Sequence, residues 1–236
     1  MLSKVPLVVL FLFSLNSLIA QNQTDFTFSG KSQKQFALNY ILRQPSTSSG
    51  KKPLLIFLHG SGEKGSKIED LSKLTTYGPL KYLATNPIDA FVLAPQCPEQ
   101  QYWNSESLYA LVQEIINKYD VDTSRIYLTG FSMGAWGTWN MAYQYPNLFA
   151  AIVPVAGYVD RIPMIEKCKI AHLPTRIFHG LQDSVVDVYY SIKIYNYLKD
   201  CNKNIELNIL PNVNHDTHKY VYETQEIYDW MLKQRK

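Results

Sequence analysis

Residues 125–134 read Arg125-Ile126-Tyr127-Leu128-Thr129-Gly130-Phe131-Ser132-Met133-Gly134. The apolar run Ile126–Thr129 is too short for a buried helix and suits a strand covered on both faces. A helical stretch opens at Met133 and extends to Tyr145. A serine in the pattern Gly-x-Ser-x-Gly between a strand and a helix lies on a tight turn, because the glycines let backbone pass close to backbone. This stretch therefore predicts a strand, a turn that exposes the Ser132 hydroxyl, and a helix.

Similar apolar runs recur along the chain and alternate with helical stretches. Buried strands are expected at Leu54–Leu58, Ala90–Ala94, Ile126–Thr129, Ala150–Val155, Arg176–Phe178 and Ile205–Leu210. Two more strands, antiparallel at a sheet edge, are expected at Asp25–Phe28 and Gln35–Leu42. Helices are expected at Ser107–Tyr119, Met133–Tyr145, Val188–Lys199 and Tyr220–Lys233. The alternation predicts an α/β fold with a mostly parallel central sheet of about eight strands and helices on both faces. No insertion between the strands is long enough to predict a large lid.

The composition is that of an ordinary globular chain. Of its 236 residues, 46% are hydrophobic and 18% are charged, and the formal net charge is +3. These values exclude collagen, coiled coils, disordered tails and polytopic membrane proteins. No run of the sequence concentrates Lys and Arg, so nucleic acid is not an expected partner.

The first residues have the pattern of a secretory signal peptide. Lys4 is followed by an apolar run from Val5 to Ala20, and polar residues begin at Gln21. A short positive region, an apolar run of this length and a small residue at its end are typical of an export signal. We expect cleavage near Ala20, a single domain over residues 21–236, and a secreted or periplasmic location; a membrane anchor that is never removed is the alternative. No later stretch reaches the roughly 20 apolar residues that cross a bilayer, so no stable membrane insertion is expected.

The chain has three cysteines, Cys97, Cys168 and Cys201. An odd number in an exported protein leaves at least one free thiol or an intermolecular bond. Cys168 and Cys201 each precede an expected strand, so both would lie at the same edge of a parallel sheet. We therefore state a disulfide between them as a hypothesis.

Ser132 is the candidate nucleophile. A hydroxyl is a poor nucleophile at neutral pH, so it needs a base within hydrogen-bond reach and a third group that orients the base. When the serine lies on such a turn, the acid and then the histidine follow it along the chain. A serine that merely caps the helix is the alternative, although capping would not require a glycine on each side.

The expected acid and base lie in loops after the last two strands. Asp183 is the expected acid; Asp187 stands just before a helical stretch, where an Asp is a good helix cap, and is the alternative. His215 is the expected general base, and His218, near the start of the final helix, is the alternative. The spacing His215-x-x-His218 is too little for a zinc site, so neither a metal nor an organic cofactor is expected.

An acyl-transfer serine also requires N–H donors aimed at the oxygen that becomes negative. One is expected from the backbone of Met133, the residue after the serine. The second is expected from Ser61, in the glycine-containing loop after Leu54–Leu58, with Gly62 as the alternative.

Aromatic residues near the expected strand ends are candidates for substrate contact. Trp103 is expected to form a wall of the cleft and to stack on a phenolic or sugar ring. Tyr77 and Trp136 are expected to serve mainly in packing.

Taken together, the motifs of this chain resemble those of the α/β-hydrolase superfamily. They are Leu58-His59-Gly60-Ser61-Gly62-Glu63, Ala94-Pro95-Gln96-Cys97-Pro98, Arg125 to Gly134, Phe149 to Pro154, Phe178-His179-Gly180 with Asp183, and Asn214-His215-Asp216. More narrowly, the chain is similar to exported bacterial esterases of the carboxylesterase, feruloyl-esterase and polyhydroxybutyrate-depolymerase type, which are often labelled prolyl-oligopeptidase-like. The resemblance covers about residues 51–236. It implies Ser132 as nucleophile, Asp183 as acid, His215 as base, and the amides of Ser61 and Met133 as oxyanion donors.

The sequence departs from the family pattern after the acid. The resemblance leads us to expect proline where this chain has Asp187, which leaves a second carboxylate near Asp183. The expected function is hydrolysis of carboxylic esters, with short acyl or aryl (feruloyl-type) groups, free or linked to polysaccharide, through an acyl-enzyme. A serine peptidase of the prolyl-oligopeptidase-like type is one alternative, and a non-catalytic carbohydrate-binding protein on a hydrolase fold is another.

Overall fold

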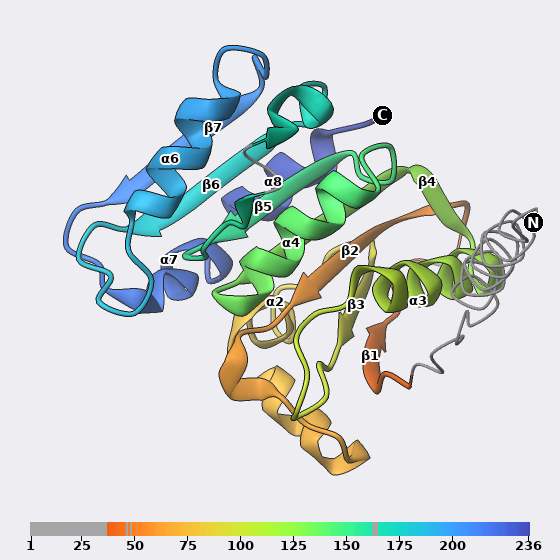
Figure 1. Cartoon of the computed structure of the whole chain (residues 1–236). Helices are drawn as coiled ribbons and strands as arrows, with labels where there is room; N and C mark the ends of the chain where they lie inside the picture. Colours follow the sequence, from red (N-terminus) through yellow and green to blue (C-terminus); the bar gives the residue numbers. More distant parts are fainter. Residues whose placement is uncertain (1–36, 46, 48, 162–164) are drawn as a thin grey trace, which may run out of the picture. The chain divides into compact units, whose positions relative to one another are not determined.

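The computed structural model of the chain describes residues 37–45, 47, 49–161 and 165–236. Within them, seven strands form one sheet in the order β1-β3-β2-β4-β5-β6-β7 (Figure 1). The strands are β1 (Tyr40–Arg43), β2 (Lys52–Leu58), β3 (Phe91–Pro95), β4 (Val121–Phe131), β5 (Ala151–Val155), β6 (Thr175–Gly180) and β7 (Ile205–Leu210). The α-helices are α2 (Gly78–Tyr82), α3 (Ser105–Lys118), α4 (Met133–Gln144), α6 (Tyr189–Leu198), α7 (His218–Tyr222) and α8 (Gln225–Lys233). The 3-10 helices are η1 (Ser61–Glu63), η2 (Ile68–Thr75), η3 (Lys167–Ile170) and η4 (His215–Thr217).

The sheet confirms the predicted α/β architecture. All neighbouring strands are parallel except β1, which pairs antiparallel with β3 at the edge, as expected for the second of the two N-terminal strands. The first of those strands, Asp25–Phe28, and the predicted signal peptide, Met1–Ala20, lie outside the described residues. Both therefore stay predictions, as does the domain boundary at residue 21.

The predicted C-terminal helix, Tyr220–Lys233, is wrong as a single element. The structure has α7 and α8 with a break between them, because Thr224 is extended at φ −130° and ψ 147°. Its hydroxyl donates to the Val221 carbonyl at 3.2 Å, so it terminates α7 rather than continuing the helix. Two further helices, η2 and α2, lie between β2 and β3, where no sequence pattern predicted them.

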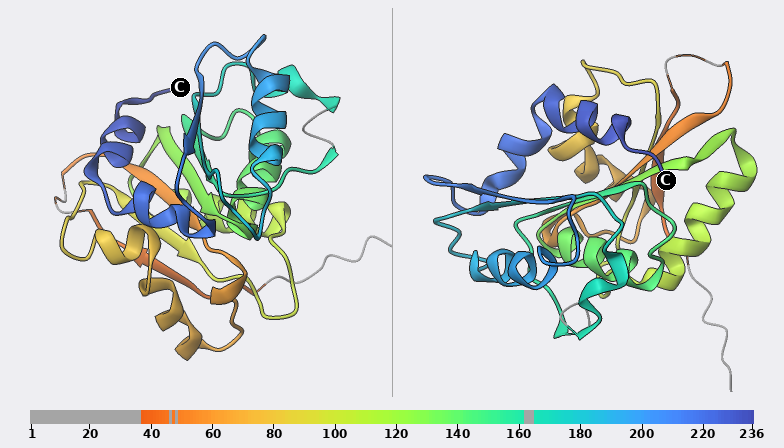
Figure 2. Two further views of the ribbon diagram at one scale, coloured as in Figure 1. Left: turned by 90° about the vertical axis from the view of Figure 1, so that its left-hand side faces the viewer. Right: turned by 90° about the horizontal axis from the view of Figure 1, so that it is seen from above.

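Helices cover both faces of the sheet, as predicted. Strand β2 shows the division: Leu54, Ile56 and Leu58 belong to the core under α3, α4 and α6, whereas Leu55 and Phe57 belong to the core under α2, α7 and α8. Figure 2 shows the two helical layers on opposite sides of the strands. Because both faces are buried, the strands read as continuous apolar runs.

Two other expectations can be compared with the described residues. No helix among them is long and apolar enough to span a bilayer. No disulfide joins Cys168 to Cys201 in this part of the chain, so the hypothesis of that bond is wrong for this structure. That hypothesis assumed that Cys168 lies directly before a strand. In the structure Cys168 is exposed on η3, and a turn separates η3 from β6.

The strand register brings the expected chemical groups to one edge. Leu58 pairs with Gly130, and Phe131 pairs with Val155, so the loops after β2, β4 and β5 leave the sheet side by side. Gly180 pairs with Leu210, which brings the loops after β6 and β7 together in the same way. Ligand sites of open parallel sheets lie at this carboxyl edge.

Glycine allows α4 to begin directly against the loop after β2. A Cβ atom added to Gly134 would lie 1.9 Å from the Leu58 carbonyl oxygen and 2.9 Å from that of His59. A Cβ on Gly130 would lie 2.2 Å from the Gly134 carbonyl oxygen. The turn that carries Ser132 can therefore approach its neighbours only because these positions have no side chain.

We expect Gly134→Ala to lower the free energy of unfolding by about 2 kcal/mol or more, because backbone atoms must move to admit the methyl group. Gly62→Ala is the matched control, since its added Cβ would have no atom within 4 Å. Urea denaturation of both variants measures the difference. Equal stability of Gly134→Ala and wild type would contradict the packing described for this turn.

Candidate active site

Ser132 lies at the turn between β4 and α4 in an unusual backbone conformation. Its φ is 55° and its ψ is −114°, a region that residues other than glycine rarely occupy. Holding a residue there costs on the order of 1–3 kcal/mol, and such strain clusters at functional sites. The turn is held by the Ser132 amide, which donates to the Val155 carbonyl at 2.9 Å, and by the Trp136 amide, which donates to the Ser132 carbonyl at 3.2 Å.

The structure brings the three predicted catalytic side chains into one hydrogen-bonded line. His215 Nδ1 lies 2.8 Å from Asp183 Oδ2, and His215 Nε2 lies 2.9 Å from Ser132 Oγ. A carboxylate only accepts, so Nδ1 carries the proton and Nε2 is left to accept from the serine hydroxyl. The arrangement leaves the imidazole ready to take the proton of Ser132.

Asp183 is a buried carboxylate with several donors. Its side chain is 0% exposed, whereas that of His215 is 21% exposed. Asp183 Oδ1 accepts from the amides of Val185 and Val186, both at 2.9 Å. His179 Nε2 lies 3.2 Å from Oδ2, so two imidazoles share this oxygen. These contacts fix the carboxylate in position before it orients His215.

His179 is held so that it donates toward Asp183. Its Nδ1 lies 2.7 Å from the hydroxyl of Ser191, and its Nε2 lies 2.9 Å from the Val186 carbonyl oxygen. Burial lowers the pKa of His179 below its ordinary value, although the nearby Asp183 raises it. A neutral ring with its proton on Nε2 and a hydrogen bond from Ser191 at Nδ1 satisfies all of these contacts.

Asn214 and Gly180 hold the loops that carry the acid and the base. Asn214 Oδ1 accepts from the amide of His215 at 2.7 Å and from the amide of Ser184 at 2.9 Å. A Cβ on Gly180 would lie 2.3 Å from the Val213 carbonyl oxygen and 2.5 Å from that of Asn214. The two loops are thus in direct backbone contact.

The alternative acid and base occupy other places. Asp187 is exposed, and its Oδ1 accepts from the amide of Tyr189 at 2.8 Å, the capping role considered for it. The ring of His218 packs on Phe131 and Tyr77, each at a centroid distance of 4.6 Å. Burial lowers the pKa of His218 to about 4. The geometry therefore favours Asp183 and His215.

The loop after β2 places the expected oxyanion donors beside the turn. Ser61 and Gly62 are exposed at the start of η1, and Met133 begins α4, where the first backbone N–H groups have no partner within the helix. Gly134 packs on the carbonyl oxygens of Leu58 and His59, so η1 starts close to the N-terminus of α4. The donor roles of Ser61 and Met133 stay predictions.

A set of hydrogen bonds fixes this loop. The amide of Gly60 donates to the Tyr77 hydroxyl at 3.0 Å, and that hydroxyl donates to the carboxylate of Glu63. The side chain of Gln96 donates to the Glu63 carbonyl at 2.9 Å. Burial raises the pKa of both Glu63 and Tyr77. The loop that would present the oxyanion donors is held from several sides.

The expectation for Trp103 is wrong. Its side chain is only 5% exposed, and its Nε1 donates to the His59 carbonyl at 3.2 Å. The indole lies at a centroid distance of 4.8 Å from the His59 ring and packs against Gly137 of α4. The position of Trp103 after a strand led us to expect it in the cleft. Because α4 packs closely against β2, the indole instead lies beneath the loop after β2 and contacts His59.

Sequence reasoning missed the structural contributions of His179, Tyr77 and Asn214. His179 lies four residues before Asp183 and contacts it, but no pattern in the sequence indicated this contact. Tyr77 lies between β2 and β3, in a segment with no periodic pattern that predicts contact with Glu63. Asn214 precedes His215 directly, and an Asn at such a turn is a common backbone acceptor; this signal could have indicated its role.

The described residues include no group of three or more His, Cys, Asp or Glu side chains placed to hold a metal ion. The polar groups of the site are directed at one another and at the serine. The arrangement has the parts required for general-base activation of a hydroxyl.

The chain is similar to known proteins in sequence and in fold. The model of a family described as phospholipase/carboxylesterase matches residues 44–231. The mouse (Mus musculus) protein named lysophospholipase-like protein 1 is 26% identical over 209 residues, with 75% of this chain and 85% of that protein covered. Acetylxylan esterase A of Emericella nidulans is 52% identical over 54 residues, but these are 23% of this chain and 18% of that enzyme.

Among solved structures, one described as a thermostable esterase has a TM-score of 0.74 and 26% sequence identity. The match covers 87% of this chain and 62% of that one. The chain thus spans less than two thirds of the length of that esterase.

The buried ring of His59 makes stability depend on pH. Desolvation lowers the pKa of His59 to about 4 from an ordinary value of 6.5. As pH falls from 7 to 5, the unfolded chain takes up a proton at this residue and the folded chain does not. The free energy of unfolding should therefore fall by about 2 kcal/mol over this interval on account of His59.

We expect His59→Gln to lose less stability between pH 7 and pH 5 than wild type does. The glutamine amide can still accept from Cys97 N and donate to the Gly60 carbonyl, the bonds that His59 makes, but it does not titrate. Urea denaturation at the two pH values measures both losses. Equal losses in the two proteins would show that His59 does not account for this pH dependence.

Proposed function

The chain belongs to the phospholipase/carboxylesterase family of α/β hydrolases, and we propose that it is a serine esterase that cleaves carboxylic esters through an acyl-enzyme. Ser132 is the nucleophile, His215 the general base and Asp183 the orienting acid. The amides of Ser61 and Met133 are the oxyanion donors.

One observation carries the proposal: the hydrogen-bonded line from Asp183 through His215 to Ser132. Both distances, 2.8 and 2.9 Å, lie within the range in which a base takes a proton from a nucleophile. The acid is fully buried and the serine has the strained backbone of a strand-to-helix turn. A structural hydrogen bond would require neither feature.

The reaction follows from the placement of these atoms. His215 Nε2 takes the hydroxyl proton as Ser132 Oγ bonds to the acyl carbon, and the carbonyl electron pair moves onto its oxygen. The amides at the loop after β2 and at the start of α4 stabilise that negative oxygen. When the tetrahedral intermediate collapses, the alcohol leaves with the proton from His215. A water molecule, activated by the same imidazole, then releases the acid and restores Ser132.

The proposed substrates are short acyl or aryl esters, including feruloyl-type esters and esters carried on a polysaccharide. The name of the acetylxylan esterase that matches 54 residues of this chain supports an acetyl group on a sugar polymer. The predicted export supports a polymer met outside the cell, and a secreted or periplasmic location is part of the proposal. An uncovered site would admit a polymer, in line with the predicted lack of a large lid.

We expect Ser132→Ala to lower kcat for p-nitrophenyl acetate by about 10^4-fold or more, because no other side chain replaces the nucleophile. Ser72→Ala is the control, since its hydroxyl is exposed and donates to the Glu69 carbonyl, and it should retain wild-type activity. Circular dichroism checks that both variants are folded. Undiminished turnover by folded Ser132→Ala would contradict the mechanism.

Two further measurements distinguish the esterase from the alternatives, a serine peptidase and a non-catalytic carbohydrate-binding protein. A peptidase would cleave peptide p-nitroanilides in addition to p-nitrophenyl esters, and we expect no release of p-nitroaniline here. A non-catalytic protein would show no turnover and no labelling of Ser132 by a fluorophosphonate probe. We expect labelling in wild type and none in Ser132→Ala.

We expect Asp183→Asn to lower kcat by about 10^3- to 10^4-fold, because the amide no longer holds the proton on His215 Nδ1. The matched control is Asp187→Asn, the nearby exposed carboxylate, and we expect its kcat to change less than threefold. Measuring kcat on p-nitrophenyl acetate tests both variants. A larger loss in Asp187→Asn would assign the role of acid to that residue instead.

A further inference from the structure

Five aromatic side chains form a continuous row beside Ser132. We propose that this row, which we call the aromatic strip, binds the sugar rings of an esterified oligosaccharide and so places its ester at the serine. The proposal rests on the proposed function and deepens it by assigning a subsite for the alcohol part of the substrate. The strip consists of Tyr102, Trp136, Tyr158, Tyr190 and Tyr189.

The rings touch one another in sequence, although they come from four separate segments. The ring of Tyr102, in the loop after β3, meets Trp136 of α4 edge-on at a centroid distance of 5.9 Å. Trp136 is stacked with Tyr158, in the loop after β5, at 6.0 Å. Tyr158 meets Tyr190 of α6 at 6.4 Å, and Tyr190 meets Tyr189 at 6.2 Å. The strip therefore crosses the N-terminal ends of α4 and α6.

The middle of the strip is fixed to the turn that carries Ser132. Trp136 donates its backbone N–H to the Ser132 carbonyl. Tyr158 follows Gly157, where an added Cβ would lie 2.8 Å from the same carbonyl oxygen. The backbone of Trp136 and the residue before Tyr158 therefore both lie against the carbonyl group of Ser132.

Much of the aromatic strip is exposed to solvent, unlike aromatic side chains of a buried core. Tyr102 is 62% exposed, Tyr189 is 55% exposed and Tyr190 is 40% exposed. Lys64 lies over the ring of Tyr102, and Lys193 lies over that of Tyr189, at the two ends of the row. In folded proteins, large aromatic side chains gathered in one exposed row usually mark a binding surface.

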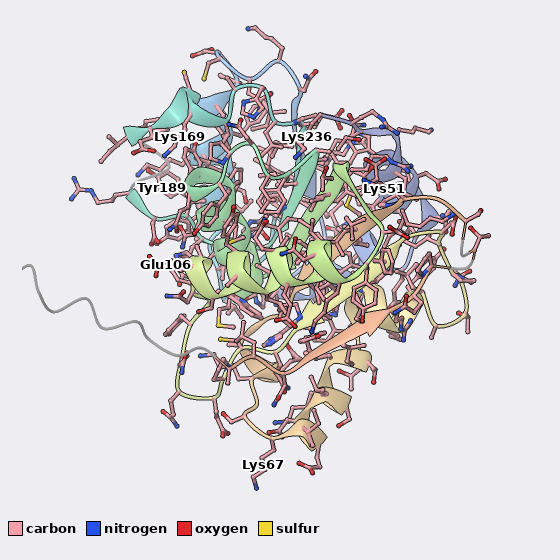
Figure 3. All side chains as sticks on the ribbon, turned by 90° about the vertical axis from the view of Figure 1, so that its right-hand side faces the viewer. Lys51, Lys67, Glu106, Lys169, Tyr189 and Lys236 are labelled. Carbon is pink, nitrogen blue, oxygen red and sulfur yellow. The ribbon has the colours of Figure 1, made fainter. Side chains whose placement is uncertain are left out.

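Polar groups line the adjoining cavity. Asp160 Oδ2 accepts from Trp136 Nε1 at 2.6 Å, and Asp160 is one of the residues that line a cavity of about 360 Å³. That cavity is lined by Ser105, Asn140 and Gln144 among others. Figure 3 shows Glu106, next to Ser105 at the start of α3, on the same side as Lys169 and Tyr189. Hydroxyl, amide and carboxylate groups therefore adjoin the aromatic faces.

This combination fits a pyranose chain better than a fatty acyl chain. A pyranose ring has an apolar C–H face, which packs on an aromatic ring, and hydroxyl groups at its edge, which need hydrogen-bond partners. A fatty acyl chain would offer no hydrogen bonds to the polar groups that line this cavity, and would itself stay largely in water on so exposed a surface. The chemistry of the strip thus points to a carbohydrate.

Binding of unesterified sugars to the Ser132→Ala protein tests the proposal without turnover. Isothermal titration calorimetry with xylohexaose and with cellohexaose should show binding of at least one of them. Tyr190→Ala and Trp136→Ala, each made in the Ser132→Ala protein, should weaken that binding at least fivefold, whereas Tyr190→Phe, which keeps the ring, should retain it. Tyr190 is exposed, so its variant stays informative even if Trp136→Ala fails to fold.

Tyr197→Ala is the matched control. Tyr197 is on the same helix and is also 40% exposed, but it lies seven residues, or about 10 Å, along the helix from Tyr190. It should bind the sugar as tightly as the parent protein does. Absence of binding by both hexasaccharides, or an equal loss in Tyr197→Ala and Tyr190→Ala, would overturn the proposal.

Kinetics then connect the strip to the reaction. In the otherwise native enzyme, Tyr190→Ala should lower kcat/KM for an acetylated xylo-oligosaccharide at least fivefold more than kcat/KM for p-nitrophenyl acetate. An unchanged ratio would overturn the assignment of this surface to the substrate. Sugar binding without any esterase activity would count against the proposed function alone, and esterase activity without sugar binding would count against the strip alone.

Discussion

The site depends on one constraint: a non-glycine residue is held at positive φ where a buried strand meets a helix. Ser132 can occupy this conformation because several independent contacts hold the backbone around it. Its own amide is bonded to β5, its carbonyl accepts two amides of α4, and the neighbouring glycines allow contact distances that a methyl group would prevent. The strain is small compared with the packing of a strand buried on both faces, and it leaves the hydroxyl projecting from the edge of the sheet.

A second set of contacts positions His215 and Asp183, and it too combines a glycine that allows close backbone contact with hydrogen bonds between neighbouring loops. Gly180 brings the loop after β6 against the loop after β7, and Asn214 bonds to both. The side chain of Asp183 is completely buried and is surrounded by two amides and two imidazoles, so its orientation is set before any substrate binds. The loop after β2 is fixed similarly through Tyr77 and Glu63. Each group of the site is therefore held by contacts that lie outside the hydrogen-bonded line of Asp183, His215 and Ser132.

Much of this arrangement could be predicted from the sequence, and the parts that could not have physical reasons. Short apolar runs identified the parallel strands, and the glycines around Ser132 identified the turn, because both are local patterns. Trp103 was misjudged because its burial depends on how closely α4 approaches β2, a distance that no local pattern records. The role of His179 depends on a contact with Asp183 across a loop, and the break at Thr224 depends on one residue becoming extended within an otherwise helical pattern.

The glycine contacts also divide the carboxyl edge of the sheet into an inner and an outer layer. The inner layer consists of backbone packed on backbone, and it tolerates almost no change of residue. The outer layer, which includes Tyr102, Tyr158 and Tyr189, consists of side chains whose replacement would not bring backbone atoms into collision. Directed evolution of this protein should accordingly change ligand preference through substitutions in the outer layer. Such substitutions leave the packed backbone of the inner layer, and with it the position of Ser132, unchanged.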